Sequence, residues 1–281
     1  MLPKLGFSLQ ANYDLPMAQV IPMVKQAEFS ALSPVWTSEA ELEAIADCAK
    51  QNSMALQSLH APRKNIPFLW TSDTPQSSEI LESILCCIDG CNRFQIPITV
   101  IHSWQGLNYT FPDTPLDFQA FDRIVAYARQ KQVSIAFENL EGEEYLDALM
   151  RRYQDQAHVG FCWDSGHDRC HPHRMDFLKA FGDRLIMTHL NDNFGIRDPA
   201  GIPAKIDDLH FLPYDGNTDW DNVISRLKSA AKQATLNFEF KIRSHSTDPR
   251  DLPYVQLSLE DFLGEAGRRA RKIARMYAEI M

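Results

Sequence analysis

The sequence lacks the features that mark membrane-spanning and secreted proteins. No apolar run approaches the ~20 residues that a membrane helix needs. The first residues, MLPKLGFSLQ, lack a charged region followed by an apolar core, so no secretory signal is visible. We therefore expect a cytoplasmic protein with no membrane partner.

Paired CxxC spacing is also absent, although the chain contains six cysteines. Three of them, Cys86, Cys87 and Cys91, fall in one helical-looking segment, ILESILCCIDGCNRF. A metal site in this segment is one interpretation, but the missing pairs favour reduced thiols packed in or near a core. The sequence shows no internal repeat and no low-complexity tract.

Positive charge is scarce, because 28 Lys and Arg residues face 37 Asp and Glu residues, for a formal net charge of −9. Proteins that bind DNA neutralise several phosphates with Lys and Arg. The acidic balance therefore opposes nonspecific attraction to nucleic acid, although a local basic patch could still exist. We expect a small-molecule substrate rather than a nucleic-acid partner.

Short β-like runs alternate with helical segments along the 281 residues, which are 44% hydrophobic and 23% charged. That length suits either two small domains or one α/β barrel of ~250 residues. Apolar residues that recur every three or four positions, as in Leu42, Ile45 and Ala49, predict the helices. Strands are predicted over 4–10, 31–36, 54–60, 97–102, 133–138, 158–164, 184–190 and 235–240. Helices are predicted over 16–28, 38–52, 77–94, 115–132, 143–154, 173–182 and 219–233.

Strands that alternate with helices in this way are typical of a closed parallel barrel. We predict an α/β fold, a (β/α)8 TIM barrel, that forms a single domain over residues 1–281. An additional C-terminal helix is expected over 258–281, broken near Gly264 and Gly267. Two connections, 61–76 and 191–218, are long for this scheme, and long loops are usually functional.

Most of the later predicted strands end in a carboxylate or an imidazole. The carboxyl ends of barrel strands meet at one mouth, where active sites lie. Because side chains alternate along a strand, Glu138 shares a face with Ala136, while Phe137 points to the helix layer. The strand-end residues are His60, His102, Glu138, Asp164, His189 and Glu239.

Burial of several carboxylates and imidazoles at one barrel mouth costs free energy that some other interaction must offset. Like charges raise each other's pKa values, and buried charge is costly unless it is paired or bound to a metal. Each residue alone could be hydrogen-bonded or salt-bridged, but six in register favour a shared divalent cation. Oxygen and nitrogen ligands without thiolate suit Zn, Mn, Co or Mg.

Short motifs between residues 59 and 240 carry a resemblance to a known superfamily. In chain order they are LHAP (59–62), VIHS (100–103), FENL (137–140), WDSGH (163–167), HLND (189–192), DLH (208–210) and FEF (238–240). With this order and spacing the chain resembles the xylose isomerase-like TIM barrel superfamily. That superfamily includes sugar isomerases and epimerases and is related to the endonuclease IV family of DNA-repair enzymes.

The resemblance implies one divalent metal, held by Glu138, Asp164, His189 and Glu239. The two glutamates would also act as the catalytic acid/base pair, which moves a proton next to a carbonyl through a metal-stabilised enediolate. In endonuclease IV, nine ligands hold three zinc ions. The five further positions match His60, His102, His167, Asp208 and His210, which are therefore additional metal ligands or substrate contacts.

These matches indicate a metal-dependent sugar or sugar phosphate isomerase or epimerase. Two alternatives stay open: an endonuclease IV-like AP endonuclease with three zinc ions, and a metal-dependent dehydratase or lyase on the same barrel. Against the endonuclease, Arg63 stands where that family has an aromatic residue after HAP. A binding module without catalysis is disfavoured because Glu138 and Glu239 are both intact. One ion is expected, and up to three fit the ligand set.

Several other residues could contact the substrate or support the ligands. Asn139 could hydrogen-bond a neighbouring ligand. His158 is expected to be structural, at the far end of the barrel, and His171 and His173 are expected in a solvated loop. His245 could reach the rim. Homo-oligomers are common in the superfamily, but no interface is visible in the sequence. The candidate substrate-binding residues are Arg63, Trp104, Arg197 and Lys241.

Overall fold

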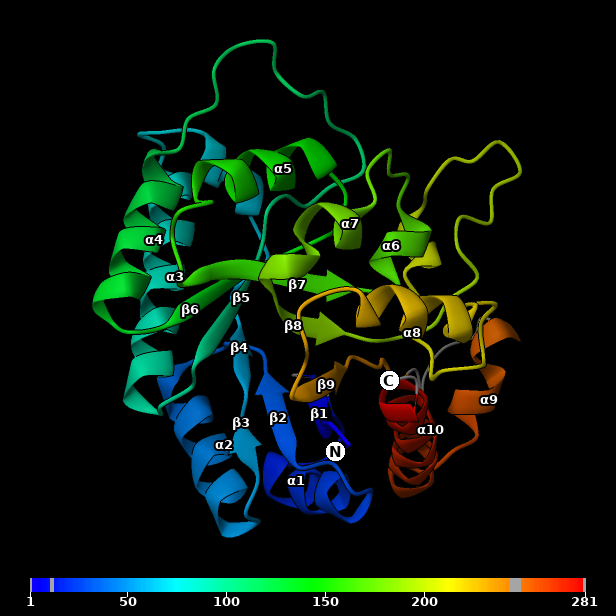
Figure 1. Cartoon of the computed structure of the whole chain (residues 1–281). Helices are drawn as coiled ribbons and strands as arrows, with labels where there is room; N and C mark the ends of the chain where they lie inside the picture. Colours follow the sequence, from blue (N-terminus) through cyan, green and yellow to red (C-terminus); the bar gives the residue numbers. More distant parts are fainter. Residues whose placement is uncertain (1, 11–12, 243–248, 280–281) are drawn as a thin grey trace.

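The structure is a computed structural model that describes residues 2–10, 13–242 and 249–279. Parallel strands form a ring that is enclosed by helices (Figure 1). Two sheet segments have the strand orders β3-β2-β1-β9 and β4-β5-β6-β7-β8. Parallel bridges between Val35 and His60, and between Leu190 and Phe238, join the two segments and close the barrel. The predicted (β/α)8 fold is therefore confirmed.

The strands agree with the prediction to within one or two residues at most ends. One predicted strand, 54–60, is interrupted at Gln57 and gives two short strands, β3 and β4. The strands are β1 (Lys4–Leu9), β2 (Ala31–Pro34), β3 (Ala55–Leu56), β4 (Ser58–His60), β5 (Ile98–His102), β6 (Ser134–Glu138), β7 (Val159–Asp164), β8 (Leu185–His189) and β9 (Thr235–Phe238).

Helices follow most strands, and side chains cap several of them. The hydroxyl of Ser38 accepts a hydrogen bond from Glu41 N–H, and that of Thr74 accepts one from Ser77 N–H. The α-helices are α1 (Met17–Gln26), α2 (Glu39–Gln51), α3 (Pro75–Arg93), α4 (Gln119–Gln130), α5 (Glu143–Arg152), α6 (His167–Cys170), α7 (Phe177–Phe181), α8 (Trp220–Lys228), α9 (Leu252–Val255) and α10 (Leu259–Glu279). The 3-10 helices are η1 (Ile66–Trp70), η2 (Gly182–Arg184), η3 (Lys205–Asp207) and η4 (Pro249–Asp251).

Alternation along the strands divides the buried residues between two layers. Phe137, Phe161 and Trp163 pack in the main core between the strands and the helices. On the other face of the same strands, a small separate cluster fills the barrel interior. This arrangement confirms that Glu138, which shares a face with Ala136, points inward. The interior cluster consists of Val100, Ala136, Cys162 and Met187.

The prediction of a break in the C-terminal helix is wrong. α10 runs without interruption from Leu259 to Glu279. Gly267 is buried where the helix crosses the end of α1, and a Cβ at this position would clash with the carbonyl oxygen of Ala27. Gly264 faces open space. A glycine costs only ~1 kcal/mol in a helix interior, so tertiary packing holds the helix together across both glycines.

Both long connections contain short helical turns rather than extended irregular chain. η1 lies within 61–76, and η3 lies within 191–218. Cys87 and Cys91 are buried and unpaired, as expected for reduced thiols near a core, whereas Cys86 is exposed. Among the described residues, no helix is long and apolar enough to cross a membrane.

Candidate metal centre

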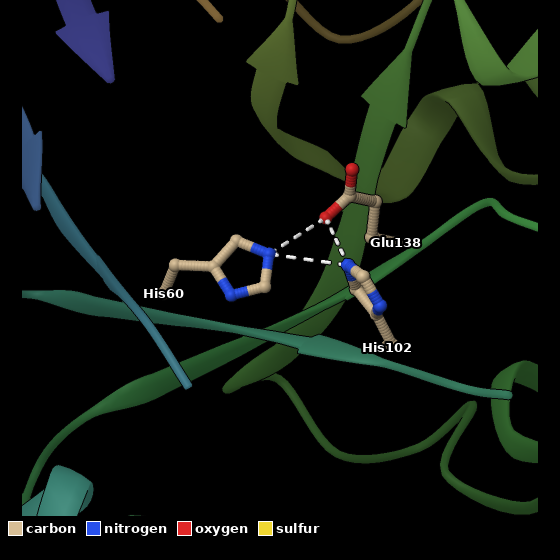
Figure 2. Close-up of side chains that lie close together, drawn as sticks. All are labelled: His60, His102 and Glu138. Carbon is tan, nitrogen blue, oxygen red and sulfur yellow. Dashed lines mark hydrogen bonds and ion pairs between the residues drawn. The ribbon is translucent and has the colours of Figure 1, made fainter. Parts of the chain in front are cut away.

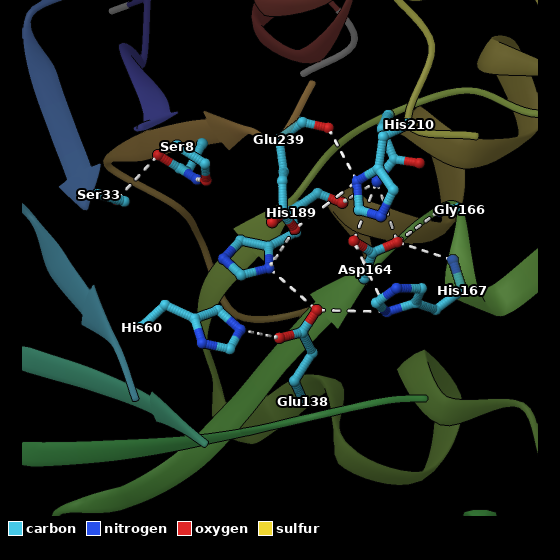
Figure 3. A network of polar contacts seen from close by, with 12 residues as sticks. Ser8, Ser33, His60, Glu138, Asp164, Gly166, His167, His189, His210 and Glu239 are labelled. Carbon is cyan, nitrogen blue, oxygen red and sulfur yellow. Dashed lines mark hydrogen bonds and ion pairs between the residues drawn. The ribbon is translucent and has the colours of Figure 1, made fainter. Parts of the chain in front are cut away.

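Four strand-end side chains converge at the mouth of the barrel (Figure 3). Glu138 ends β6, Asp164 ends β7, His189 ends β8, and Glu239 follows β9. The strand register pairs Asp164 with His189 and His102 with Glu138, which brings their side chains to one level. Each of the four residues is buried and offers one ligand atom, and these atoms all lie within 4.8 Å of one another.

His189 lies between the two glutamates. Its Nδ1 is 3.0 Å from Glu138 Oε1 and 3.0 Å from Glu239 Oε2. Burial raises the pKa of Glu138, but the charge of His189 and hydrogen bonds from His102 and His167 outweigh burial and hold it well below its usual range. The pKa of Glu239 is likewise held low against burial, by His189 and His210. Both carboxylates are therefore ionised, which is the form that binds a cation.

The segment Asp164-Ser165-Gly166-His167 fixes the direction of the Asp164 carboxylate. Asp164 Oδ1 accepts the backbone N–H groups of Gly166 and His167, each at 2.7 Å. Asn191 Nδ2 donates to Oδ2 at 3.0 Å. A Cβ at Gly166 would clash with the Asn191 side chain, so this position requires glycine. The strand thus ends in a carboxylate whose orientation is set by the turn that follows it.

Asn139 links the two neighbouring strands behind these candidate ligands. Its Nδ2 donates to the carbonyl oxygen of Asp164 at 2.9 Å, and its Oδ1 accepts the Asp164 N–H at 2.7 Å. The carbonyl oxygen of Asn139 lies 3.0 Å from Nδ1 of His167. Asn139 thus hydrogen-bonds both backbone groups of Asp164, and support of a metal ligand by Asn139 stays a prediction.

A second group of donors surrounds the other oxygen of Glu138 (Figure 2). Glu138 Oε2 lies 3.3 Å from Nε2 of His60 and 3.4 Å from Nε2 of His102. The two imidazole nitrogens are 3.2 Å apart. Both contacts are longer than a normal charge-assisted hydrogen bond, so this buried Oε2 has no full-strength partner within the described structure. Nitrogen and oxygen atoms that face one another around such a carboxylate oxygen fit a divalent cation.

The remaining candidate ligands gather on the Asp164 side. His167 and His210 form a further buried group with Asp164. Asp208 Oδ1 lies 2.7 Å from His210 Nε2 and 3.5 Å from His167 Nε2. His210 has a φ of +49°, a left-handed conformation that is unusual for a residue with a side chain. The structure thus brings together all nine residues that the sequence indicated as ligands or possible ligands.

A cavity of about 640 Å³ opens onto this centre. Glu138 and Glu239 line the cavity, whereas Asp164 and His189 are not among its lining residues. Arg63 and Lys241, two of the candidate substrate-binding residues, also line it. The two glutamates are therefore the members of the four-residue centre that a bound molecule reaches first.

The other two candidate substrate-binding residues lie outside the cavity lining. Trp104 stacks on Tyr145, with ring centroids 4.3 Å apart. Arg197 pairs with Asp207, with Nε 2.6 Å from a carboxylate oxygen. The described contacts of Trp104 and Arg197 are those of loop packing, and a substrate contact for either residue stays a prediction.

The prediction for His171 is wrong, because this residue is buried and lines the cavity rather than a solvated loop. Its Nε2 lies 3.5 Å from Glu141 Oε2. His171 is the extended residue directly after α6, and its ring centroid lies 5.6 Å from that of His167.

Two other histidines outside the centre contact backbone carbonyl oxygens nearby. His173 is half-buried, with Nε2 3.1 Å from the carbonyl oxygen of His167, so it is not in a solvated loop either. His158 lies 3.0 Å from the carbonyl oxygen of Val125, in agreement with a structural role. His245 lies outside the described residues.

The fold and the geometry define a parallel barrel with a carboxylate–imidazole centre at the carboxyl ends of its strands. The chain belongs to the xylose isomerase-like TIM barrel family, which matches residues 21–259. Over 164 residues it is 34% identical to the uncharacterized protein y4fM of Sinorhizobium fredii, which covers 54% of this chain and 49% of that protein. The chain thus spans about half the length of this curated relative.

Solved structures with the same fold cover nearly the whole chain. A D-tagatose 3-epimerase-like protein has a TM-score of 0.68 at 16% identity, covering 99% of this chain and 97% of its own. The IOLI protein with a binding zinc atom has a TM-score of 0.72 at 16% identity, with 99% of each chain covered. The 3-keto-D-glucoside 4-epimerase YcjR from E. coli has a TM-score of 0.68 at 13% identity, covering 97% and 99%. At these identities the similarity establishes the fold.

Proposed function

We propose that the protein is a divalent-metal-dependent isomerase or epimerase that acts on a carbohydrate or a related hydroxy-carbonyl compound. One ion would be held by Glu138, Asp164, His189 and Glu239. The observation that carries this proposal is the position of His189, whose Nδ1 is 3.0 Å from an oxygen of each glutamate. β7 and β8 separate the strands that carry the glutamates, so the two carboxylates reach the same point from different sides of the mouth.

The four ligands divide into two roles. Asp164 and His189 would serve only to hold the ion, since the turn after β7 fixes the Asp164 carboxylate and neither residue lines the cavity. Glu138 and Glu239 open into the cavity, so one can accept the proton from the substrate carbon and the other can return it. A divalent cation bound here would supply Lewis acidity at the carbonyl and hydroxyl oxygens of the substrate.

The names of structurally similar proteins support a sugar-like substrate and a metal. Two of them are described as a 3-epimerase-like protein for D-tagatose and a 4-epimerase for a 3-keto-D-glucoside. The IOLI structure contains a zinc atom. These descriptions belong to those proteins, and for the present chain they indicate which substrates and which metal to test first.

Replacement of Glu239 by Gln tests the acid/base assignment. We expect Glu239→Gln to lower turnover by at least ~10²-fold, because an amide cannot carry the proton. Exchange of the substrate C–H with solvent deuterium, followed by NMR over a panel of ketoses, measures the loss. A matched control is Glu141→Gln, which changes another carboxylate that lines the cavity but belongs to none of the donor groups.

The control should keep exchange within about tenfold of the wild type, with both variants folded by circular dichroism. Substantial exchange by Glu239→Gln, or an equal loss in both variants, would refute the assigned role of Glu239.

One observation favours a second candidate function, an AP endonuclease with three zinc ions. His60, His102 and Glu138 form one further group of donors, and Asp164, His167 and His210 form another. Three bound ions per chain together with cleavage of DNA at abasic sites would establish this alternative. The net charge of −9 argues against it.

A further inference from the structure

We propose that the outer part of the cavity binds an anionic group, a phosphate or a carboxylate, that the substrate carries at the end away from the reacting carbon. We call this region the basic rim and define it as Arg63, Lys64 and Lys205. The inference rests on the proposed function, since it assigns a substrate class to the same cavity.

The basic rim and the catalytic candidates share one cavity but differ in depth. Arg63, Lys64 and Lys205 line the same space of about 640 Å³ as Glu138 and Glu239. The three cations are exposed, whereas the two glutamates are buried. A molecule that occupies the whole cavity would therefore contact buried carboxylates at one end and exposed cations at the other.

The charges of the basic rim are not neutralised by the described part of the protein. Within the described ranges, no carboxylate forms an ion pair with Arg63, Lys64 or Lys205. Lys241, on the same cavity wall, differs from them because its Nζ is 2.7 Å from Asp208 Oδ2. Glu141 and Asp208 also line the cavity, but their described ion pairs are with histidines and with Lys241. A bound anion would supply the basic rim with a close counter-charge.

The two long connections supply the basic rim. Arg63 and Lys64 follow β4, in the connection that begins directly after His60. Asn65, next in the chain, has a φ of +70° and also lines the cavity, so a left-handed turn directs this segment along the wall. Lys205 begins η3 in the connection after β8. Segments about 140 residues apart in the sequence thus place like charges on one cavity.

The charge of the whole chain makes these positions significant. With a formal net charge of −9, the molecule repels an anionic substrate at long range. Cations at a cavity mouth reverse the local potential and raise the local concentration of an anion. An anionic group held by the exposed cations leaves the other end of the substrate facing Glu138 and Glu239. The guanidinium of Arg63 matches phosphate or carboxylate through a pair of hydrogen bonds.

Calorimetric titration of the metal-loaded protein tests this inference. The probes are inorganic phosphate, D-fructose 6-phosphate, D-galacturonate, D-fructose and a DNA duplex with an abasic site. The rim variant carries Arg63→Gln, Lys64→Gln and Lys205→Gln. The matched control carries Lys50→Gln, Arg123→Gln and Arg129→Gln, which remove the same charge from exposed positions on α2 and α4 outside the cavity.

We expect the wild type and the control to bind at least one anionic probe more tightly than D-fructose, and the rim variant to bind it about tenfold more weakly. A preference for D-galacturonate identifies a carboxylate as the anion, and a preference for the phosphates identifies a phosphate. The inference is overturned if no anionic probe binds the wild type below ~10 mM, or if the rim and control variants bind equally. It is also overturned if abasic-site DNA binds more tightly than every small anion.

These measurements distinguish a failure of the basic rim inference from a failure of the proposed function. Anion binding at the rim without proton exchange on any substrate would leave the rim inference standing and remove the proposed function. Epimerisation of neutral, phosphorylated and carboxylate-bearing substrates with the same kcat/KM would support the proposed function and overturn the inference.

Discussion

At the residue scale, Glu138 contacts candidate ligands on both sides of its carboxylate. One carboxylate oxygen faces His189 and His167, and the other faces His60 and His102. Gln has the same reach as this fully buried carboxylate but only one acceptor oxygen, so it cannot accept from imidazoles on both sides. Glu138 therefore joins the four-residue centre to the second group of donors.

Asn139→Ala tests how the surroundings of the ligands position them. The substitution removes both hydrogen bonds to the backbone of Asp164 and leaves a buried N–H and a buried C=O unpaired. We expect a loss of ~2–4 kcal/mol in the free energy of unfolding and a roughly tenfold or greater loss of metal affinity. Urea denaturation and competition with a chelator measure the two effects. Unchanged metal affinity would show that Asn139 does not position Asp164.

At the element scale, helix packing rather than local propensity decides the structure of α10. The two glycines of α10 have different surroundings: Gly267 lies against the carbonyl oxygen of Ala27, and Gly264 faces open space. A helix crossing this close requires a residue without Cβ at the contact.

Gly267→Ala and Gly264→Ala form a matched pair on this helix. Gly267→Ala should destabilise the protein by ~1–3 kcal/mol, because the new methyl group forces α10 away from Ala27. Gly264→Ala should be neutral or stabilise it by up to ~1 kcal/mol through helix propensity alone. Guanidinium denaturation midpoints measure both changes. Equal effects of the two substitutions would contradict this packing.

The sequence predicted those features that have a local or periodic signal. Strand alternation placed Phe137 outward and Glu138 inward, and the strand ends indicated six of the nine ligand candidates. The other three came from the resemblance to a known superfamily and are His167, Asp208 and His210. The break at Gly267 was predicted wrongly because the contact with Ala27 is formed between segments far apart in the chain. His171 was misplaced because four-residue α6 is too short to show periodicity by itself. Lys205 was not identified, because the sequence does not show that the loop carrying this lysine lies beside the cavity.

At the scale of the whole molecule, the centre ties the two sheet segments together. Glu138, Asp164 and His189 belong to the segment that contains β4–β8, whereas Glu239 follows β9 of the other segment. A cation bound by all four residues would cross-link the barrel close to the Leu190–Phe238 bridge. Because such an ion binds only the folded state, it would raise the stability of the whole protein.

Removal of metal by chelation should therefore lower the melting temperature. With free ion at 1,000 times its Kd, the stabilisation is ~4 kcal/mol, which corresponds to a fall of roughly 10 °C on removal. Calorimetry before chelation, after chelation and after return of Zn²⁺ or Mn²⁺ measures the change. Glu239→Gln provides the control, because its weakened site should make the melting temperature much less sensitive to chelator.

The most direct test of the central claim is the number of ions bound per chain in metal-replete protein, measured by elemental analysis and native mass spectrometry. The account predicts one divalent ion per chain in the wild type and none in a variant that carries both Glu138→Gln and Glu239→Gln. A wild type that binds no ion, a wild type that binds three, or a double variant that keeps the ion would contradict it.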